Sequence, residues 1–145
     1  QALAKKWGES SKTYALFTQR YPKHSQSRLA YIGMGVALRE QKLHAEAIVA
    51  FGGILKDEKR DELGAQAQYL LAECYLDQKK YDQAIAEYKK VAPYPFKEWQ
   101  SKALYETAVA FERKGERDRA NEQFEELVTE YPETEAAKLA GKRGK

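Results

Sequence analysis

The chain has 145 residues, of which 43% are hydrophobic and 32% are charged, and its net charge is +3. This balance is typical of one helical domain or a piece of a longer array, and the basic residues are too dispersed to form the aromatic-containing basic face of a nucleic-acid-binding protein. No run of about 18 apolar residues predicts a membrane span, and no signal peptide is expected at residue 1.

The first part of the chain predicts helices that alternate with short breaks. Residues 1–6 read as the last turn of a helix, and residues 7–20 read as a second helix, which ends at Pro22 because proline cannot continue it. Residues 25–41 and 44–56 carry apolar residues at helical spacing. Gly52 and Gly53 lie inside the later helix. Either they face outwards at a tolerated cost or they permit a close approach by another helix or a partner.

The middle of the chain predicts a pair of amphipathic helices over residues 61–91, with a polar break at residues 77–80. Ala72 and Ala84 supply small side chains where the two helices must approach closely. Prolines at positions 93 and 95 then predict an extended link. After this link, Phe96 and Trp99 either pack over the start of the next helix or form an exposed aromatic patch.

The last part predicts another pair, over residues 97–130, whose helices meet at residues 114–116. A tyrosine-proline closure follows at residues 131–132. Thr134 is expected to cap a last helix that extends to about residue 143, with Ala137, Leu139 and Ala140 on its apolar side. This helix has no partner helix after it in the chain.

The helical pairs repeat in register. The small residue of each second helix recurs at spacings of 84 − 47 = 37 and 120 − 84 = 36 residues, each time followed by an aromatic residue. These motifs are Ala47-x3-Phe51, Ala84-x3-Tyr88 and Ala120-x3-Phe124, and the first-helix motifs are Tyr31-x2-Met34-Gly35-x2-Leu38, Gln68-x2-Leu71-Ala72-x2-Tyr75 and Leu104-x2-Thr107-Ala108-x2-Phe111. They resemble the tetratricopeptide repeat, whose pattern is W-x2-L-G-x2-Y, then A-x3-F, then P, over about 34 residues. Tyr81, Gly115 and Pro132 also fit its turn and closing positions.

The resemblance implies an all-α fold: a right-handed superhelical solenoid of antiparallel helix pairs. It divides residues 1–145 into a half-repeat (1–22), three complete repeats (25–59, 61–95 and 97–132) and the terminal helix of a half-repeat (134–145). The tyrosine-proline closures and the ending FEELVTEYPETEAAKLAGKR are similar to those of bacterial cell-envelope members. Among these are the periplasmic Tol–Pal coordinator and lipoproteins of outer-membrane assembly.

The sequence offers no catalytic or metal-binding pattern. His24 and His44 lie in turns, without a cysteine or carboxylate at metal-ligand spacing, and Cys74 lies within a helix with no base spaced to activate it. No enzyme activity, metal or cofactor is therefore predicted.

The resemblance instead implies a binding groove, because the first helices of such repeats line the concave wall. The residues expected there are Ile32, Val36, Arg39, Tyr69, Glu73, Leu76, Lys102, Tyr105, Val109, Glu112 and Arg113. Tyr69 and Tyr105 would be the side-by-side anchors, whose truncation should spare the fold, and Leu76 and Val109 would extend an apolar floor. The competing interpretation is plain solenoid surface. A lysine-asparagine clamp for chaperone tails is absent.

We therefore expect a non-enzymatic scaffold that binds a protein or peptide segment in its concave groove, within a bacterial envelope assembly. The alternative is a structural spacer or self-association module of a larger multi-repeat protein. The open ends predict weak self-association. A periplasmic or envelope location is expected, with the cytoplasm left open, and no nucleic-acid partner is expected.

Overall fold

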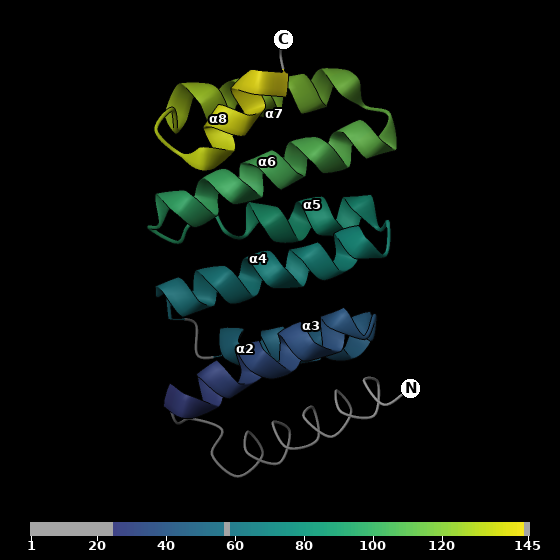
Figure 1. Cartoon of the computed structure of the whole chain (residues 1–145), viewed down its shortest axis with the longest axis vertical. Helices are drawn as coiled ribbons and strands as arrows, with labels where there is room; N and C mark the ends of the chain where they lie inside the picture. The colour runs from purple at the N-terminus through teal and green to yellow at the C-terminus, as the bar shows by residue number, and fades with distance from the viewer. Residues whose placement is uncertain (1–24, 57–58, 144–145) are drawn as a thin grey trace. The chain divides into compact units, whose positions relative to one another are not determined.

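The computed structural model describes residues 25–56 and 59–143, and within these ranges it is entirely helical (Figure 1). The helices expected in residues 1–20, and the closure at residues 21–22, lie outside the described residues. The described helices are α2 (Ser25–Glu40), α3 (His44–Leu55), α4 (Glu62–Asp77), α5 (Tyr81–Lys89), α6 (Lys97–Lys114), α7 (Arg117–Glu130) and α8 (Glu135–Arg143). They confirm the helices predicted from residue 25 onwards, to within a few residues at each end.

The chain divides into two compact units, residues 1–59 and 60–145, which are described separately. In unit 1, α2 and α3 pack through a close contact at Gly35. A Cβ atom on this glycine would lie 2.4 Å from Cε1 of the fully buried Phe51 ring. The glycines of α3 have different surroundings: Gly53 faces the Tyr31 ring, with 3.0 Å between its ideal Cβ and Tyr31 Cε1, whereas Gly52 faces open space. Gly52 therefore fits the interpretation of a glycine that faces outwards, and Gly53 fits that of a close approach by another helix.

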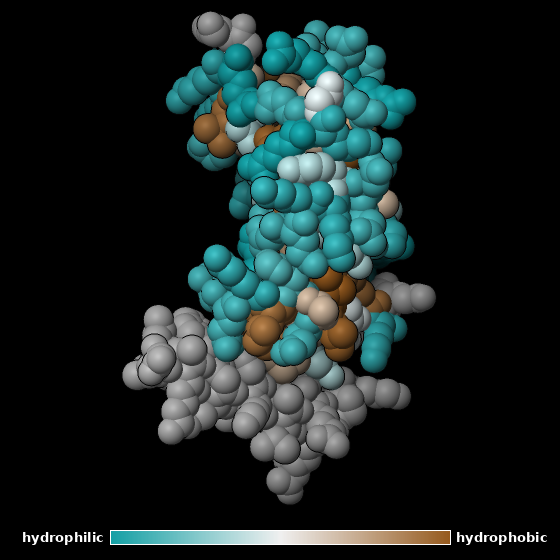
Figure 2. Space-filling view, turned by 90° about the vertical axis from the view of Figure 1, so that its right-hand side faces the viewer, coloured by the Kyte–Doolittle hydropathy of each residue, from teal (hydrophilic) through white to brown (hydrophobic). Residues whose placement is uncertain are grey.

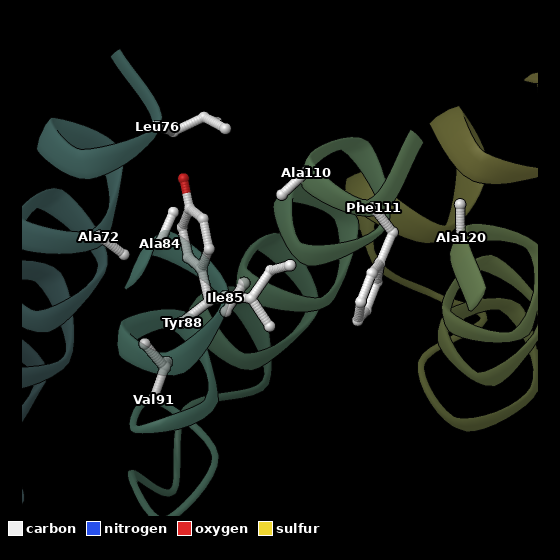
Figure 3. Packing of buried hydrophobic residues seen from close by; sticks show 10 residues of the cluster. Ala72, Leu76, Ala84, Ile85, Tyr88, Val91, Ala110, Phe111 and Ala120 are labelled. Carbon is white, nitrogen blue, oxygen red and sulfur yellow. The ribbon is translucent and has the colours of Figure 1, made fainter. Parts of the chain in front are cut away.

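Unit 2 contains α4–α8, stacked so that each helix packs on its neighbours (Figure 1). The small residues predicted to lie at the helix contacts, Ala72, Ala84, Ala108 and Ala120, are all fully buried. Around them, Ile85, Tyr88 and Val91 fill the space between α4, α5 and α6 (Figure 3). Apart from Ala108, these side chains belong to one apolar cluster that α4, α5, α6 and α7 share, so no helix pair buries its apolar stripe alone.

Buried polar groups in this core have partners. Gln68, on α4, is 5% exposed, and its Nε2 donates 2.8 Å hydrogen bonds to the backbone oxygen and to Oε2 of Glu87 on α5. The Thr107 hydroxyl donates to the Ala103 carbonyl at 2.7 Å. The buried amide and hydroxyl are therefore tolerated because each makes hydrogen bonds within the fold.

Local signals set the helix ends of unit 2. The Asp61 carboxylate accepts a 2.9 Å bond from the Gly64 N–H at the start of α4, and Gly115 ends α6 with a φ of 88°, in the left-handed region. Thr134 caps α8 as predicted, since its hydroxyl oxygen accepts a 3.2 Å bond from the Ala137 N–H. The apolar side of α8 was partly misassigned. Leu139 is 49% exposed, and Ala136 packs inwards instead.

The link between α5 and α6 is ordered by its own contacts. Tyr94 is 4% exposed, and Gln100 Nε2 donates to the Ala92 and Tyr94 carbonyls at 2.9 and 2.6 Å. Trp99 lies in the first turn of α6 and packs against the core. Trp99 therefore packs over the start of α6 and does not form an exposed aromatic patch, although its side chain is only half-buried.

Candidate functional site

The candidate site is a row of aromatic side chains in unit 2, all of them half-buried except Tyr88, which is fully buried. Its first part, the first aromatic set, consists of Tyr69 on α4, Tyr88 on α5 and Trp99 on α6. The Tyr69 ring centroid lies 5.7 Å from that of Tyr88 and 5.5 Å from that of Trp99, both in tilted arrangements. Lys102 Nζ lies 4.6 Å from the Trp99 ring centroid. Trp99 and Lys102 lie about one turn apart on α6, so the Trp99 ring packs against the core while the Lys102 ammonium makes a cation–π contact with it.

The second aromatic set consists of Tyr105 on α6 and Phe124 on α7, which meet edge to face with centroids 5.6 Å apart. Arg143, near the end of α8, lies above both rings, with its Cζ 5.0 Å from the Phe124 centroid and 5.9 Å from that of Tyr105. Its guanidinium also forms an ion pair with Glu112. Hydrogen bonding to the Glu112 carboxylate raises the pKa of Arg143, so this cation stays charged.

The two sets follow the repeat. Tyr69 and Tyr105 are 36 residues apart, as are Tyr88 and Phe124. In each set a ring on a first helix packs against a ring on the following second helix, and a cation from the next first helix lies nearby. The arrangement is thus a recurring feature of the fold.

Glu73 has a structural role at this site. The Tyr88 hydroxyl donates to Glu73 Oε1 at 2.5 Å, and the Tyr88 side chain is only 1% exposed. Burial, followed by the charge of Glu73, raises the pKa of the Tyr88 phenol well above its usual range. Glu73 therefore accepts a hydrogen bond from a buried phenol, which limits what it can offer a ligand.

The structure corrects several expectations about the groove residues. Leu76 and Val109, expected to form an exposed floor, are 6% and 8% exposed and belong to the helix packing. Tyr69 and Tyr105 lie in separate aromatic sets, where each packs against core residues, so we now expect their truncation to cost stability. One part of each ring packs against buried residues of the core, so that only the remaining part is exposed.

The other expected groove residues are distributed over both units. Lys102, Glu112 and Arg113 are exposed on α6, and Glu112 pairs with Arg143. Ile32, Val36 and Arg39 belong to α2 of unit 1, where Val36 is 39% exposed and the other two are half-buried. Sequence reasoning missed Phe124 and Arg143 as surface-forming residues, and it did not assign Trp99 to the first-helix face. The helical spacing from Trp99 to Lys102 was the available signal for Trp99.

No group of histidine, cysteine and carboxylate side chains able to hold a metal ion occurs among the residues that the structure describes. Among the same residues, no helix is long and apolar enough to cross a membrane.

Two models of the tetratricopeptide repeat match the chain, at residues 50–98 and 102–134. No curated protein matches it.

Solved structures show the same fold. MamA (residues 41 to the end) from Desulfovibrio magneticus RS-1 superposes with a TM-score of 0.68 at 18% identity, over 86% of this chain and 66% of that one. A second MamA structure gives 0.67 at 17% identity, over 92% and 76%. A tetratricopeptide repeat protein from Parabacteroides merdae ATCC 43184 gives 0.69 at 14% identity, over 97% of this chain but only 58% of its own. The chain thus spans about two thirds or less of the first and third of these proteins.

Proposed function

We propose that this chain, whose residues 50–98 and 102–134 are tetratricopeptide repeats, is a non-enzymatic scaffold that binds a peptide or helical segment along the first-helix face of unit 2. The first aromatic set, with Lys102 above Trp99, is the observation that carries this proposal. The Tyr69 and Trp99 rings pack against the core on one side and are partly exposed on the other. Because this packing already restricts the rings, they lose little conformational entropy when a ligand binds to them.

The charges around the rings suggest how a ligand is oriented. Lys102 and Arg113 are exposed along α6, whereas Glu73 and Glu112 already accept bonds from Tyr88 and Arg143. These two cations therefore supply positive charge beside the Trp99 ring and farther along α6. We infer that the preferred segment carries an apolar or aromatic anchor for the Tyr69–Trp99 rings and an acidic residue close by.

Trp99 provides a direct test, because the chain has only two tryptophans, Trp7 and Trp99. In a Trp7→Phe background, Trp99 fluorescence reports on the proposed site alone. Segments selected from a displayed library of acidic peptides, some with helical propensity, are titrated into this variant. We expect a saturable change in Trp99 emission, which Lys102→Glu weakens about tenfold, equivalent to about 1.4 kcal/mol.

Gln83→Lys, at an exposed position on α5, is the matched control and should leave the affinity unchanged. Tyr69→Phe keeps the ring packing and removes only the hydroxyl, so it tests whether this group orients the ligand. Two outcomes would contradict the proposal: binding without a change in Trp99 emission, or an affinity that Gln83→Lys lowers and Lys102→Glu does not. Either outcome would place the binding site on the second-helix face.

The proposed setting is a bacterial cell-envelope assembly, with the protein in the periplasm or attached to the envelope. The resemblance of the tyrosine-proline closures and the C-terminal sequence to envelope members supports this setting. Fractionation of the source cells, with the protein followed by an antibody, tests it, and a purely cytoplasmic pool would refute it. The alternative, a structural or self-associating module, is favoured by the exposed Val128 and Leu139.

A further inference from the structure

Unit 2 contains a hollow of about 360 Å³ at the edge where the C-terminal ends of α5 and α7 lie beside the first half of α6 (Figure 1). Helix α4 packs on α5 and helix α8 packs on α7, so the hollow is internal to the stack. One face of α6 forms a wall of the hollow, with residues at helical spacing: Gln100, Ala103, Leu104 and Thr107. This is not the face that carries Trp99 and Lys102, so the hollow is separate from the aromatic row.

The wall formed by α7 is acidic. Gln123, Glu126 and Glu130 follow one another at spacings of three and four residues and therefore lie on one side of α7. Like charges four residues apart repel, and the C-terminus of a helix already carries partial negative charge. The last turn of α7 contains no basic residue. Among the described lining residues, Lys89 on the α5 wall is the only cation.

The neighbouring Tyr131 is affected by this negative charge. It lines the hollow directly after Glu130, is half-buried, and packs against the cluster around Leu127. Burial, followed by the charges of Glu130 and Glu126, raises the pKa of the Tyr131 phenol. The phenol therefore stays protonated, and the negative charge of the hollow remains on the two carboxylates.

The equivalent place in the preceding repeat contains its own cation. The corresponding residues, 36 positions apart, are Gln68 and Leu104, Glu87 and Gln123, and Lys90 and Glu126. In the preceding repeat, Gln68 Nε2 lies 2.8 Å from Glu87 Oε2, and Lys90 Nζ lies 2.9 Å from Glu87 Oε1. In the later repeat, a leucine replaces the amide donor and a glutamate replaces the lysine. The balanced charges of one repeat are thus replaced by an excess of negative charge in the next.

At the opposite edge of unit 2, carboxylates of the second helices are paired. Figure 2 faces this edge, where the turns between α4 and α5 and between α6 and α7 lie and the surface of unit 2 is mostly hydrophilic. Lys114 forms an ion pair there with Asp82, at the start of α5, and another of 3.4 Å with Glu116, just before α7. In the described part of the chain, no cation pairs in this way with Glu126 or Glu130.

The size and lining of the hollow limit what it can bind. One turn of helix is about 10 Å across and about 5.4 Å long, which is more than the hollow accommodates, so its occupant is a single side chain. Ala103 and Leu104 offer apolar contact for an aliphatic stem, and the carboxylates lie on the adjoining wall. A guanidinium has five N–H donors in a planar fork that matches carboxylates, and it stacks on aromatic rings such as that of Tyr131.

We propose that this hollow binds an arginine side chain of a partner protein. The stem of this arginine packs on Ala103 and Leu104, and its guanidinium donates hydrogen bonds to the carboxylates of Glu126 and Glu130. The bound cation thus replaces the one that Lys90 supplies in the preceding repeat. It also relieves the repulsion between the two glutamates at the end of α7. This inference does not depend on ligand binding at the aromatic row.

An NMR titration of the full, ¹⁵N-labelled chain with N-acetyl-arginine amide tests the proposal. We expect saturable shifts of the side-chain amide signals of Gln100 and Gln123, which line the hollow. N-acetyl-citrulline amide, which has nearly the same shape but no charge, should cause none. The double variant Glu126→Gln with Glu130→Gln should weaken binding of the arginine probe at least about tenfold, equivalent to about 1.4 kcal/mol. Lys89→Gln should strengthen binding, because it removes a cation that repels the probe.

Glu122→Gln is the matched control, since it removes the same charge from an exposed α7 position that does not line the hollow, and it should leave the affinity unchanged. The proposal is overturned if the arginine probe causes no saturable shift of Gln123, or if the citrulline amide binds equally well. Weaker binding in Lys89→Gln would mean that the hollow prefers an anion. Tighter binding of free arginine than of the capped amide would make it a site for a small molecule.

Trp99 emission, recorded in the Trp7→Phe background, keeps this test separate from that of the aromatic row. We expect it to stay constant while the arginine probe shifts Gln123. A probe that changes Trp99 emission and leaves Gln123 unshifted binds at the aromatic row instead, and this result also overturns the proposal.

Discussion

Gly35 and Gly141 occupy the same position of the repeat but have opposite surroundings, so the same substitution should have opposite effects at the two sites. At Gly35, a Cβ atom would lie 2.4, 2.6 and 2.7 Å from three atoms of the Phe51 ring. That ring is fully buried, so its neighbours must shift if it moves aside. Overpacking of this kind costs about 1–3 kcal/mol, whereas replacing glycine by alanine within a helix gains about 1 kcal/mol.

Because three ring atoms are affected at once, we expect Gly35→Ala to lower the free energy of unfolding by about 1–2 kcal/mol. Gly141→Ala meets nothing within 4 Å and should stabilise α8, by less than about 1 kcal/mol because the helix ends at Arg143. The two variants should therefore differ by about 2 kcal/mol.

Urea unfolding followed by helical circular dichroism measures this difference, and equal m-values for the two variants make the free energies comparable. Since the glycines lie in different units, hydrogen exchange of α3 and of α8 assigns each change to its own unit. If Gly35→Ala were as stable as the parent at an unchanged m-value, the close packing of Phe51 on α2 would be wrong.

Three further predictions concern the core of unit 2. Ala84→Arg should destabilise the fold by several kcal/mol in urea unfolding, because it places an unpaired charge in a fully buried helix contact; a change within about 0.5 kcal/mol would contradict the repeat register. Tyr69→Ala should lower the free energy of unfolding by about 2 kcal/mol, because it removes the ring contacts with Trp99 and Tyr88. Tyr69→Phe keeps these contacts and should change the free energy of unfolding little. Equal stabilities of the two variants would show that the ring contacts do not stabilise the fold. Burial raises the pKa of Tyr88, so the folded state holds the phenol proton after the unfolded state has lost it. The free energy of unfolding should therefore fall as pH rises above about 10, by about 1.4 kcal/mol per pH unit. Tyr88→Phe should be less stable at neutral pH, through loss of the bond to Glu73, and should show a shallower decline above pH 10; parallel pH profiles would refute this origin.

Short-range features of the fold could be predicted from the sequence. Helix positions follow from apolar spacing, helix ends from Asp61, Gly115 and Thr134, and close helix contacts from the small residues Ala72 and Ala108. Each of these depends on residues within one or two turns, or on a register that repeats along the chain. The spacing of apolar and small residues in the sequence therefore predicts which residues of successive helices are in contact.

The surface of the candidate site was less predictable, since exposure depends on which neighbouring helix covers each side chain. The family pattern gave Leu76 and Val109 the same status as Lys102, yet the packing of the next helices buries the first two and leaves the third exposed. Likewise, the sequence placed Glu73 in the binding groove, but the hydroxyl of Tyr88, 15 residues away on α5, donates a hydrogen bond to its carboxylate.

The C-terminal end shows the same division. The sequence by itself predicted that the last helix, α8, occupies the position of a first helix of the repeat. Only the tertiary structure decided that Arg143 returns to Glu112, Tyr105 and Phe124, contacts that span 19 to 38 residues, and that Gly141 faces an open hollow. Local periodicity specifies which face of a helix is apolar, but the position of a long side chain depends on contacts between helices that are distant in the sequence.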